Sequence, residues 1–172
     1  MYRGLKKIEL TVLRRSLDYW GAFELSQELE FVIRQGEKND VFAVTPEAKY
    51  YLMGKEPEPV TAGLHIGEIG KKQLNLSLEG AYLISKMSDR KKIKVVGQAE
   101  SLVLYGRDVF GTSINWADES IEQNDKIIIA NKYGEAIGLG RSRFDYSGLF
   151  ADRVTVNTEA DLGLYIRSQS EF

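Results

Sequence analysis

The segment at residues 134–143, GEAIGLGRSR, combines glycines and arginines in a pattern that could hold phosphates. Arg141 and Arg143 are two residues apart, so on a β-strand both side chains emerge on the same face. Guanidinium groups bind phosphate oxygens, and Gly138 and Gly140 let a strand bend or another backbone come close. A curved strand with solvated arginines explains the same residues, and the spacing by itself favours it. The third glycine and the strand–turn–helix order of a dinucleotide-binding motif are missing, which excludes that interpretation.

A second candidate is LYGRDV at residues 104–109, where Tyr105 and Arg107 flank Gly106. Glycine is typical just after the end of a helix, and such a turn can present backbone N–H groups, an arginine and an aromatic ring to a nucleotide. A helix cap with Tyr105 packed in the core is the simpler explanation. Two further cations of the second half, Lys132 and Arg153, complete the set of candidate RNA-binding residues.

The residues needed for catalysis or metal binding are almost absent. The chain has no cysteine and one histidine, His65, which excludes disulfides, thiolate zinc sites and iron–sulfur clusters. The carboxylates show no metal-ligand spacing, and neither a GxSxG nor a Walker motif is present. We therefore expect no catalytic residues, no metal, no cofactor and no small-molecule substrate, and we predict that the protein is not an enzyme.

Composition limits the other classes. The 172 residues are 43% hydrophobic, enough for packed cores, and the net charge of −2 argues against coating nucleic acid through bulk charge. Residues 1–91 hold 14 basic and 13 acidic residues and residues 92–172 hold 9 and 12, so any RNA site must be a local cluster. The N-terminus shows no signal peptide and no apolar run could span a bilayer. We expect a cytoplasmic protein without a membrane partner, which the lack of cysteine fits.

Residues 4–20 show helical spacing of apolar residues and are predicted to form an amphipathic helix that stops at Gly21. Four cations lie between the apolar positions: Lys6, Lys7, Arg14 and Arg15. They indicate a solvated face or, as the sharper alternative, a contact with ribosomal RNA or a protein.

The rest of the first half reads as a meander. Alternation from Leu29 predicts a strand that ends in a polar turn at residues 35–40, followed by strands at 41–44 and 49–53 and a loop at 54–59. Residues 60–69 alternate loosely, Leu74, Leu76 and Leu78 alternate strictly, and residues 81–87 read as a short helix. The polar run at 88–92 predicts a boundary between domains at 1–90 and 91–172.

The second half is predicted to consist mainly of short strands with one helix. We expect a strand at 93–96, a helix at 99–105 ended by Gly106, and a buried strand at 126–130. A turn at 131–134 leads to a returning strand at 136–143, and strands at 154–156 and 162–166 complete the set. Short, closely spaced strands with one helix favour a small barrel.

The second half resembles a PUA domain, the small RNA-binding module found on pseudouridine synthases and archaeosine transglycosylases. The resemblance is carried by LYGRDVF (104–110), by NDKIIIANKYGEAIGLGRS (124–142) and by DLGLYIR (161–167), read as the closing strand. It fixes the spacing of these three segments over residues 104–167.

The whole chain resembles the ribosome-biogenesis factors of the nuclear-import-protein-seven family in their archaeal form. The first half carries DYWG (18–21), VFAVTPEAKYYLM (41–53) and TAGLHIGEIGKKQLNLSLEGAYLI (61–84), and the second half carries ESLVLYGRDV (100–109). The resemblance implies an α+β fold: an N-terminal antiparallel sheet with helices, followed by a PUA-type pseudo-β-barrel.

The resemblance also implies a function and a site. It implies binding to ribosomal or pre-ribosomal RNA during large-subunit maturation, a preference for uridine-rich single strands, and a partner similar to the Shwachman–Bodian–Diamond syndrome protein. Arg141 and Arg143 match the basic strand that the family uses on RNA, whereas Arg107 stands where the family usually has asparagine. Asp145 and Gly148 replace residues that are often basic in archaeal relatives, which lowers the local positive charge.

The sequence thus predicts an RNA-binding ribosome assembly factor. Arg141 and Arg143 would hold phosphates, Arg107 would reach the same groove, and Gly138 and Gly140 would let the strand curve under the RNA. Two alternatives stay open: a substrate-docking subunit of an RNA-modifying enzyme, and a protein-interaction adaptor with little RNA affinity.

Overall fold

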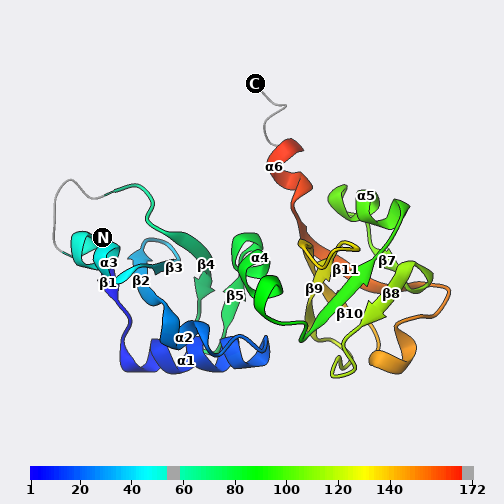
Figure 1. Cartoon of the computed structure of the whole chain (residues 1–172), viewed down its shortest axis with the longest axis horizontal. Helices are drawn as coiled ribbons and strands as arrows, with labels where there is room; N and C mark the ends of the chain where they lie inside the picture. The colour runs from blue at the N-terminus through cyan, green and yellow to red at the C-terminus, as the bar shows by residue number, and fades with distance from the viewer. Residues whose placement is uncertain (54–58, 168–172) are drawn as a thin grey trace. The chain divides into compact units, whose positions relative to one another are not determined.

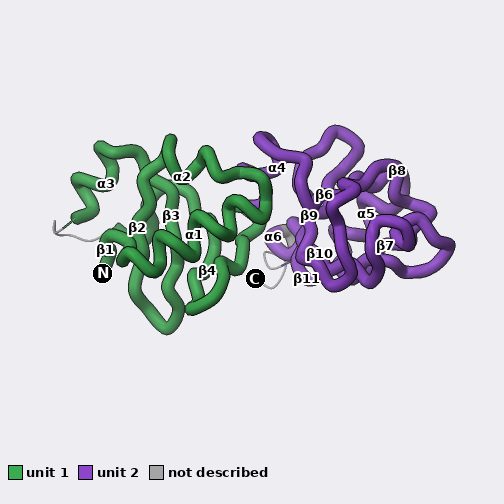
Figure 2. The backbone as a smooth tube through the Cα atoms, turned by 90° about the horizontal axis from the view of Figure 1, so that it is seen from below, with its two compact units in different colours: residues 1–80 green, residues 81–172 purple. Residues whose placement is uncertain are grey.

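The structure, a computed structural model, describes residues 1–53 and 59–167 and contains two compact units, residues 1–80 and 81–172 (Figure 2). Residues 54–58, most of the loop expected at 54–59, lie outside the described residues. The division between the units falls inside the helix α4 (Leu78–Met87). The domain boundary after residue 90 stays a prediction.

The first unit is built on a five-stranded antiparallel sheet in which each strand pairs with the next along the chain (Figure 1). Strands that follow one another along a chain usually pair in a sheet, so the order of the alternating segments in the first half agrees with this topology. The predicted antiparallel sheet with helices is confirmed. The strands are β1 (Tyr2–Gly4), β2 (Glu30–Gln35), β3 (Asn39–Val44), β4 (Leu64–Ile69) and β5 (Leu74–Leu76).

The predicted N-terminal helix is confirmed as α1 (Lys7–Tyr19), which is followed by the short helix α2 (Leu25–Glu28). Helix α1 buries Val12, Leu13, Ser16 and Leu17 and contacts β4 and β5. Its first turn is fixed by Glu9, whose carboxylate accepts the Lys6 N–H at 2.7 Å and two bonds from the Arg3 guanidinium, each at 2.7 Å. Farther along, Ser16 Oγ accepts the Leu74 N–H at 3.1 Å, so the start of β5 is held against the helix.

The strand predicted at residues 49–53 is wrong, because this segment lies in the helix α3 (Pro46–Leu52). Thr45 is its N-cap and accepts the Ala48 N–H at 3.2 Å through Oγ1, and Pro46 follows at the first helical position. Both residues are standard helix-start signals. The helix covers one face of the sheet, where Leu52 packs into a cluster with Tyr2, Val32, Phe42 and Val44.

The second unit contains a six-stranded sheet that curls into a nearly closed barrel, which confirms the predicted pseudo-barrel. The strand order is β7-β11-β10-β9-β6-β8, with β6 and β9 parallel and the other pairs antiparallel. An almost continuous isoleucine run on β9 is buried on both faces, as a central strand requires. The strands are β6 (Lys92–Val95), β7 (Val109–Phe110), β8 (Ile114–Ala117), β9 (Lys126–Ala130), β10 (Ala136–Ser142) and β11 (Val154–Asp161).

Helix α5 (Gln98–Leu104) confirms the helix expected before Gly106, whose φ of +72° ends it. It packs on β7, β10 and β11 and adds Ala99 and Val103 to the barrel core. Two short 3₁₀ helices, η1 (Gly111–Ser113) and η2 (Tyr146–Gly148), lie in the connections.

The strand predicted at residues 162–166, and with it the closing strand at 161–167, is wrong. The chain leaves the sheet at Asp161 and forms the helix α6 (Gly163–Arg167). Gly163 lies so close to the Leu104 carbonyl that an added Cβ would clash with it, and the Arg167 guanidinium donates to the same carbonyl. The last strand along the chain is instead β11, which is longer than the predicted 154–156 and pairs with both β7 and β10. The short strands β7 and β8 were not predicted.

Candidate nucleic-acid interface

The glycines of β10 face the barrel interior. Gly138 and Gly140 are buried, whereas the alternate positions Leu139 and Arg141 are partly exposed. A Cβ on Gly138 would lie 2.8 Å from the Ala160 carbonyl oxygen, and one on Gly140 would lie 2.7 Å from the carbonyl oxygen of Asn157. The pairing of β10 with β11 shifts register between Leu139 and Gly140. The glycines therefore allow the β11 backbone to pack close to β10. They face away from solvent, so they can affect a ligand site only by setting the path of the strand.

Arg141 points outward from β10 but is held by two neighbours. Its Nε donates to Glu159 Oε1 at 2.9 Å, and its Nη1 donates to the carbonyl oxygen of Asn124 at 2.9 Å. The side chain remains 40% exposed, and an ion pair at this exposure contributes only about 0.2–1 kcal/mol. A phosphate can therefore compete with Glu159 for the guanidinium.

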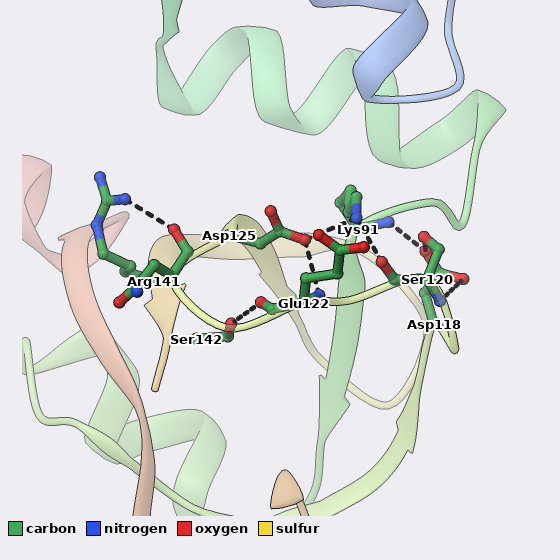
Figure 3. A network of polar contacts seen from close by, with 8 residues as sticks. Lys91, Asp118, Ser120, Glu122, Asp125, Arg141 and Ser142 are labelled. Atoms are coloured by element: carbon green, nitrogen blue, oxygen red, sulfur yellow. Dashed lines mark hydrogen bonds and ion pairs between the residues drawn. The ribbon is translucent and has the colours of Figure 1, made fainter. Parts of the chain in front are cut away.

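The carbonyl that Arg141 uses belongs to the loop at residues 118–125, which a polar network fixes in place (Figure 3). The Lys91 Nζ donates to Asp125 Oδ2 at 2.6 Å and to the Ser120 carbonyl, and the Lys91 N–H donates to Asp118 Oδ2 at 2.7 Å. The Lys91 side chain is only 8% exposed, so these bonds form away from bulk water. The loop is consequently a rigid support for Arg141.

The same loop is bonded to the end of β10. Ser142 Oγ donates to the Glu122 carbonyl at 2.6 Å, and the Ser142 N–H donates to the Asp125 carbonyl at 2.9 Å (Figure 3). The pKa of Asp118 lies below its ordinary value: burial opposes this, but hydrogen bonds from Ser120 and from the Lys91 backbone outweigh burial. The carboxylate is therefore charged at neutral pH and keeps its role as an acceptor.

Two more candidate arginines lie at the same end of the β10–β11 pair. Arg143 is one residue beyond β10, yet its N–H still bonds to the Thr155 carbonyl of β11 at 2.8 Å. Arg153 lies just before β11, with its guanidinium carbon 4.1 Å from the ring centroid of Phe144. Both arginine side chains are exposed. We call Arg141, Arg143 and Arg153, together with Phe144, the arginine surface.

Asp145 adds a negative charge beside this surface. Its carboxylate caps η2, accepting from Ser147 Oγ at 2.6 Å and from the Gly148 N–H at 3.3 Å. The hydrogen bond from Ser147 lowers the pKa of Asp145 below its ordinary value, and burial opposes this without outweighing it. The group is ionised at neutral pH and partly offsets the cations next to it.

Arg107 reaches the neighbourhood from the other edge of β11. Its carbonyl accepts Thr158 Oγ1 at 2.8 Å, and the adjacent Asp108 accepts the Thr158 N–H at 2.9 Å and Asn157 Nδ2 at 3.2 Å. Asn157 is the register partner of Arg141, so the turn after α5 is docked directly beside the arginine surface. The Arg107 side chain is exposed.

Lys132 is separated from the other candidates. It lies in the turn between β9 and β10, and β10 carries the chain about 20 Å from that turn to Ser142. Its backbone N–H is accepted by Glu100 Oε1 at 3.0 Å, and its Nζ lies 4.9 Å from the ring centroid of Tyr133. The structure therefore places Lys132 at the opposite end of β10.

The partners of the arginine surface were missed in the sequence. Glu159 and the Asn124 carbonyl lie 18 and 17 residues from Arg141, and the Phe144 ring lies nine residues from Arg153. Only strand pairing brings these groups together. The one local signal was Asn124-Asp125, a pair typical of turns, and Asn124 does adopt a φ of +69°.

The described residues bear on two further features, metal-ligand groups and membrane-length helices. In residues 1–53 and 59–167, no three His, Asp or Glu side chains gather as metal ligands. No helix in that part of the chain is both long and apolar enough to cross a bilayer. His65 lies in the sheet of the first unit, with Nε2 3.5 Å from Asp40 Oδ1 and its ring beside Phe42.

Solved structures match this chain over almost its whole length. A conserved PUA domain protein from Thermoplasma acidophilum superposes with a TM-score of 0.68 at 17% identity, covering 98% of this chain and 99% of that one. A hypothetical protein from Pyrococcus horikoshii OT3 gives 0.68 at 16% identity, covering 94% of each chain. These similarities establish the fold.

Sequence comparison identifies the family. The UPF0113 PUA domain model matches residues 91–170, and the NIP7/UPF0113 pre-PUA domain model matches residues 2–78. A UPF0113 protein from Archaeoglobus fulgidus is 35% identical over 167 residues, which cover 95% of this chain and 93% of that protein. A PUA domain in this family fits an RNA-binding role. The chain belongs to the NIP7/UPF0113 family and consists of its pre-PUA domain followed by its PUA domain.

Proposed function

We propose that this protein binds RNA through the arginine surface of its PUA domain, with Arg107 contributing from the turn after α5. One observation carries the proposal: three arginines lie at one end of the β10–β11 pair, and the guanidinium of Arg153 lies over the partly exposed ring of Phe144. Guanidinium groups hold phosphates, and an aromatic plane beside them can stack on an unpaired base. Lys132, at the far turn, would act as a separate contact.

The family supports a more specific role. We propose that the RNA is pre-ribosomal RNA of the large subunit, that uridine-rich single strands are preferred, and that the protein is a cytoplasmic assembly factor rather than an enzyme. A protein similar to the Shwachman–Bodian–Diamond syndrome protein is the proposed partner. The residues before and after the boundary at 90 would form separate domains, of which the second docks the RNA.

Fluorescence anisotropy with labelled oligo-uridine and oligo-adenosine at two salt concentrations tests this function. Three arginine–phosphate contacts should give a log–log salt slope of magnitude about 2, from about 0.7 per contact on a single strand. The Arg141→Ala/Arg143→Ala variant should lose about 1.4 of that slope and bind at least tenfold more weakly. A Lys49→Ala variant, which removes a cation from α3, serves as the charge control.

Two results would contradict the proposal. If the wild-type protein binds neither RNA at micromolar concentration, the proposed RNA-binding function is wrong. Binding that is equally strong in the arginine variant would remove the arginine surface as the site. A pull-down whose protein partners survive ribonuclease, together with the first result, would instead favour the adaptor function.

A further inference from the structure

We infer that the first unit carries a second RNA-binding surface, formed by α1 and the turn between β4 and β5. The inference rests on the proposed RNA-binding function and adds to it a site outside the PUA domain. We call this surface the basic face of α1. It comprises Lys6, Lys7, Arg14, Arg15, Lys71 and Lys72, all of which are exposed.

Packing of the helix explains why these cations gather. Helix α1 turns Val12, Leu13 and Leu17 toward the core, which leaves its charged positions to solvent. Lys7 and Arg14 are seven residues apart, so they lie on one side of the helix about 10 Å apart along its axis. The whole helix is about 20 Å long, enough to follow several nucleotides of an extended strand.

The β4–β5 turn brings two more lysines to this helix. Because Ser16 Oγ accepts the Leu74 N–H, the turn at residues 70–73 is held beside α1, and the Arg15 guanidinium donates to the Lys72 carbonyl. Lys71 and Lys6 line the same surface cavity of about 320 Å³ together with the 76%-exposed Ile8. The six cations are thus contributed by two segments more than fifty residues apart.

A second depression, of about 540 Å³, lies next to the C-terminal half of the helix. It is lined by Thr11, Arg14, Arg15, Asp18 and Phe23, and the Phe23 ring is 39% exposed. Two guanidiniums beside an exposed aromatic ring provide both elements of single-strand recognition: a positive groove for the backbone and a surface on which a base can stack.

The charge distribution of the unit favours a polyanion. Residues 1–80 hold 11 Lys and Arg against 12 Asp and Glu, so the unit as a whole is slightly acidic. Six of the 11 cations nevertheless belong to this face. Of the carboxylates that line the two depressions, Glu9 is paired with Arg3, and Asp18 lies beside Arg14 and Arg15. Lys7, Arg14, Lys71 and Lys72 make no side-chain ion pair within the described part of the chain, whereas Lys38 and Lys49 are each paired with a glutamate.

The test uses the full chain and a labelled single-stranded RNA of about 20 nucleotides. We expect Lys7→Ala/Arg14→Ala to weaken binding roughly fivefold per lost contact at about 0.1 M salt and to reduce the slope magnitude by about 1.4. Alanine is a good helix former, so α1 should persist, which circular dichroism checks. Lys49→Ala should bind RNA like the wild type.

Chemical footprinting gives an independent readout without mutation. Acetylation of the folded protein, read by mass spectrometry, should be slowed by bound RNA at Lys7, Lys71 and Lys72 and unchanged at Lys49. The charge-retaining variant Lys7→Arg/Arg14→Lys should keep most of the affinity that the alanine variant loses.

The outcomes separate this inference from the proposed function. If Arg141→Ala/Arg143→Ala loses RNA while Lys7→Ala/Arg14→Ala keeps wild-type affinity and slope, the basic face of α1 is not an RNA site and the proposed function stands. Unprotected lysines would lead to the same conclusion, and a protein partner would then be the occupant of the face. If wild-type protein binds no RNA, both proposals fail.

Discussion

The Arg141 guanidinium lies 2.9 Å from the Glu159 carboxylate across the β10–β11 pair, and both side chains are about 40% exposed. Leu139 pairs with Ala160 and Gly140 pairs with Thr158, so Glu159 is the residue of β11 that has no register partner on β10 at this shift. The residue predicted to grip phosphate is therefore partly neutralised in the free protein, and RNA must displace Glu159 to use its full charge.

Removing that competitor should strengthen RNA binding. We expect Glu159→Gln to raise affinity by up to roughly fivefold at about 0.1 M salt, because a phosphate no longer competes with the carboxylate for the Arg141 guanidinium in an exposed pair worth about 0.2–1 kcal/mol. The salt slope should keep its magnitude of about 2, since Arg141 is already one of the three phosphate contacts. The free energy of unfolding should change by less than about 1 kcal/mol, as for other exposed ion pairs. Anisotropy titrations measure the effect. If Glu119→Gln, on an exposed loop position, gives the same gain, net charge rather than the Arg141 pair is responsible.

Gly140→Ala should destabilise the PUA domain. The added Cβ would lie 2.7 Å from the Asn157 carbonyl oxygen and 2.9 Å from Val156 Cγ1, and β11 cannot move away without breaking its pairing with β10. Overpacking of this kind costs about 1–3 kcal/mol. Urea unfolding gives the value. Gly36→Ala is the matched control, because its Cβ would meet only the Lys38 carbonyl at an ordinary 3.6 Å, and a loss of similar size there would argue against the steric explanation.

Lys91→Met should cost about 3 kcal/mol, the magnitude expected when one partner of a buried ion pair is removed. Methionine keeps most of the alkyl chain but leaves Asp125 without its ammonium partner and the Ser120 carbonyl without its donor. The double variant Lys91→Met/Asp125→Asn should recover part of the loss, because it removes the uncompensated charge. Purely additive losses in the two single variants and the double variant would show that the pair does not act as a unit.

Glu9→Gln should lower stability at neutral pH by about 1–3 kcal/mol, the range for hydrogen bonds to a charged group. The Arg3 hydrogen bonds, opposed by burial and aided by the Lys6 N–H, hold the pKa of Glu9 below its ordinary value of 4.5. A lowered folded pKa means that the stabilisation is fully present above about pH 5 and is lost as the pH falls through that lowered value.

The measurement for Glu9 is a pair of urea-unfolding series from pH 7 to pH 3. The difference in the free energy of unfolding between wild type and Glu9→Gln should be constant down to about pH 5 and shrink below it, because other titrating groups are common to both proteins. A difference that stays constant to pH 3 would contradict the assigned role of the Arg3–Glu9 pair.

Local sequence signals predicted a helix or strand correctly where the periodicity of its apolar residues extends over the whole element. The apolar spacing of α1 gave the helix, and the buried run of β9, its turn and β10 gave the central hairpin, because periodicity reflects which face each residue buries. The same signals failed at α3 and α6. At α3, the short apolar run fits a helix or a strand, and the helix-start signals of Thr45 and Pro46 decide in favour of the helix. At α6, the alternation over five residues was too short to separate strand from helix.

By itself the sequence determined the order of the two domains, the family resemblance and the identity of the candidate cations. The tertiary structure alone decided which cations meet. Pairing of β10 with β11 joins Arg141 and Arg143 to Arg153 and sets Glu159 against Arg141, while the length of β10 removes Lys132 to the opposite end. The Ser16–Leu74 hydrogen bond likewise adds Lys71 and Lys72 to α1. These neighbours depend on strand register and on contacts between distant segments, and no local pattern encodes either.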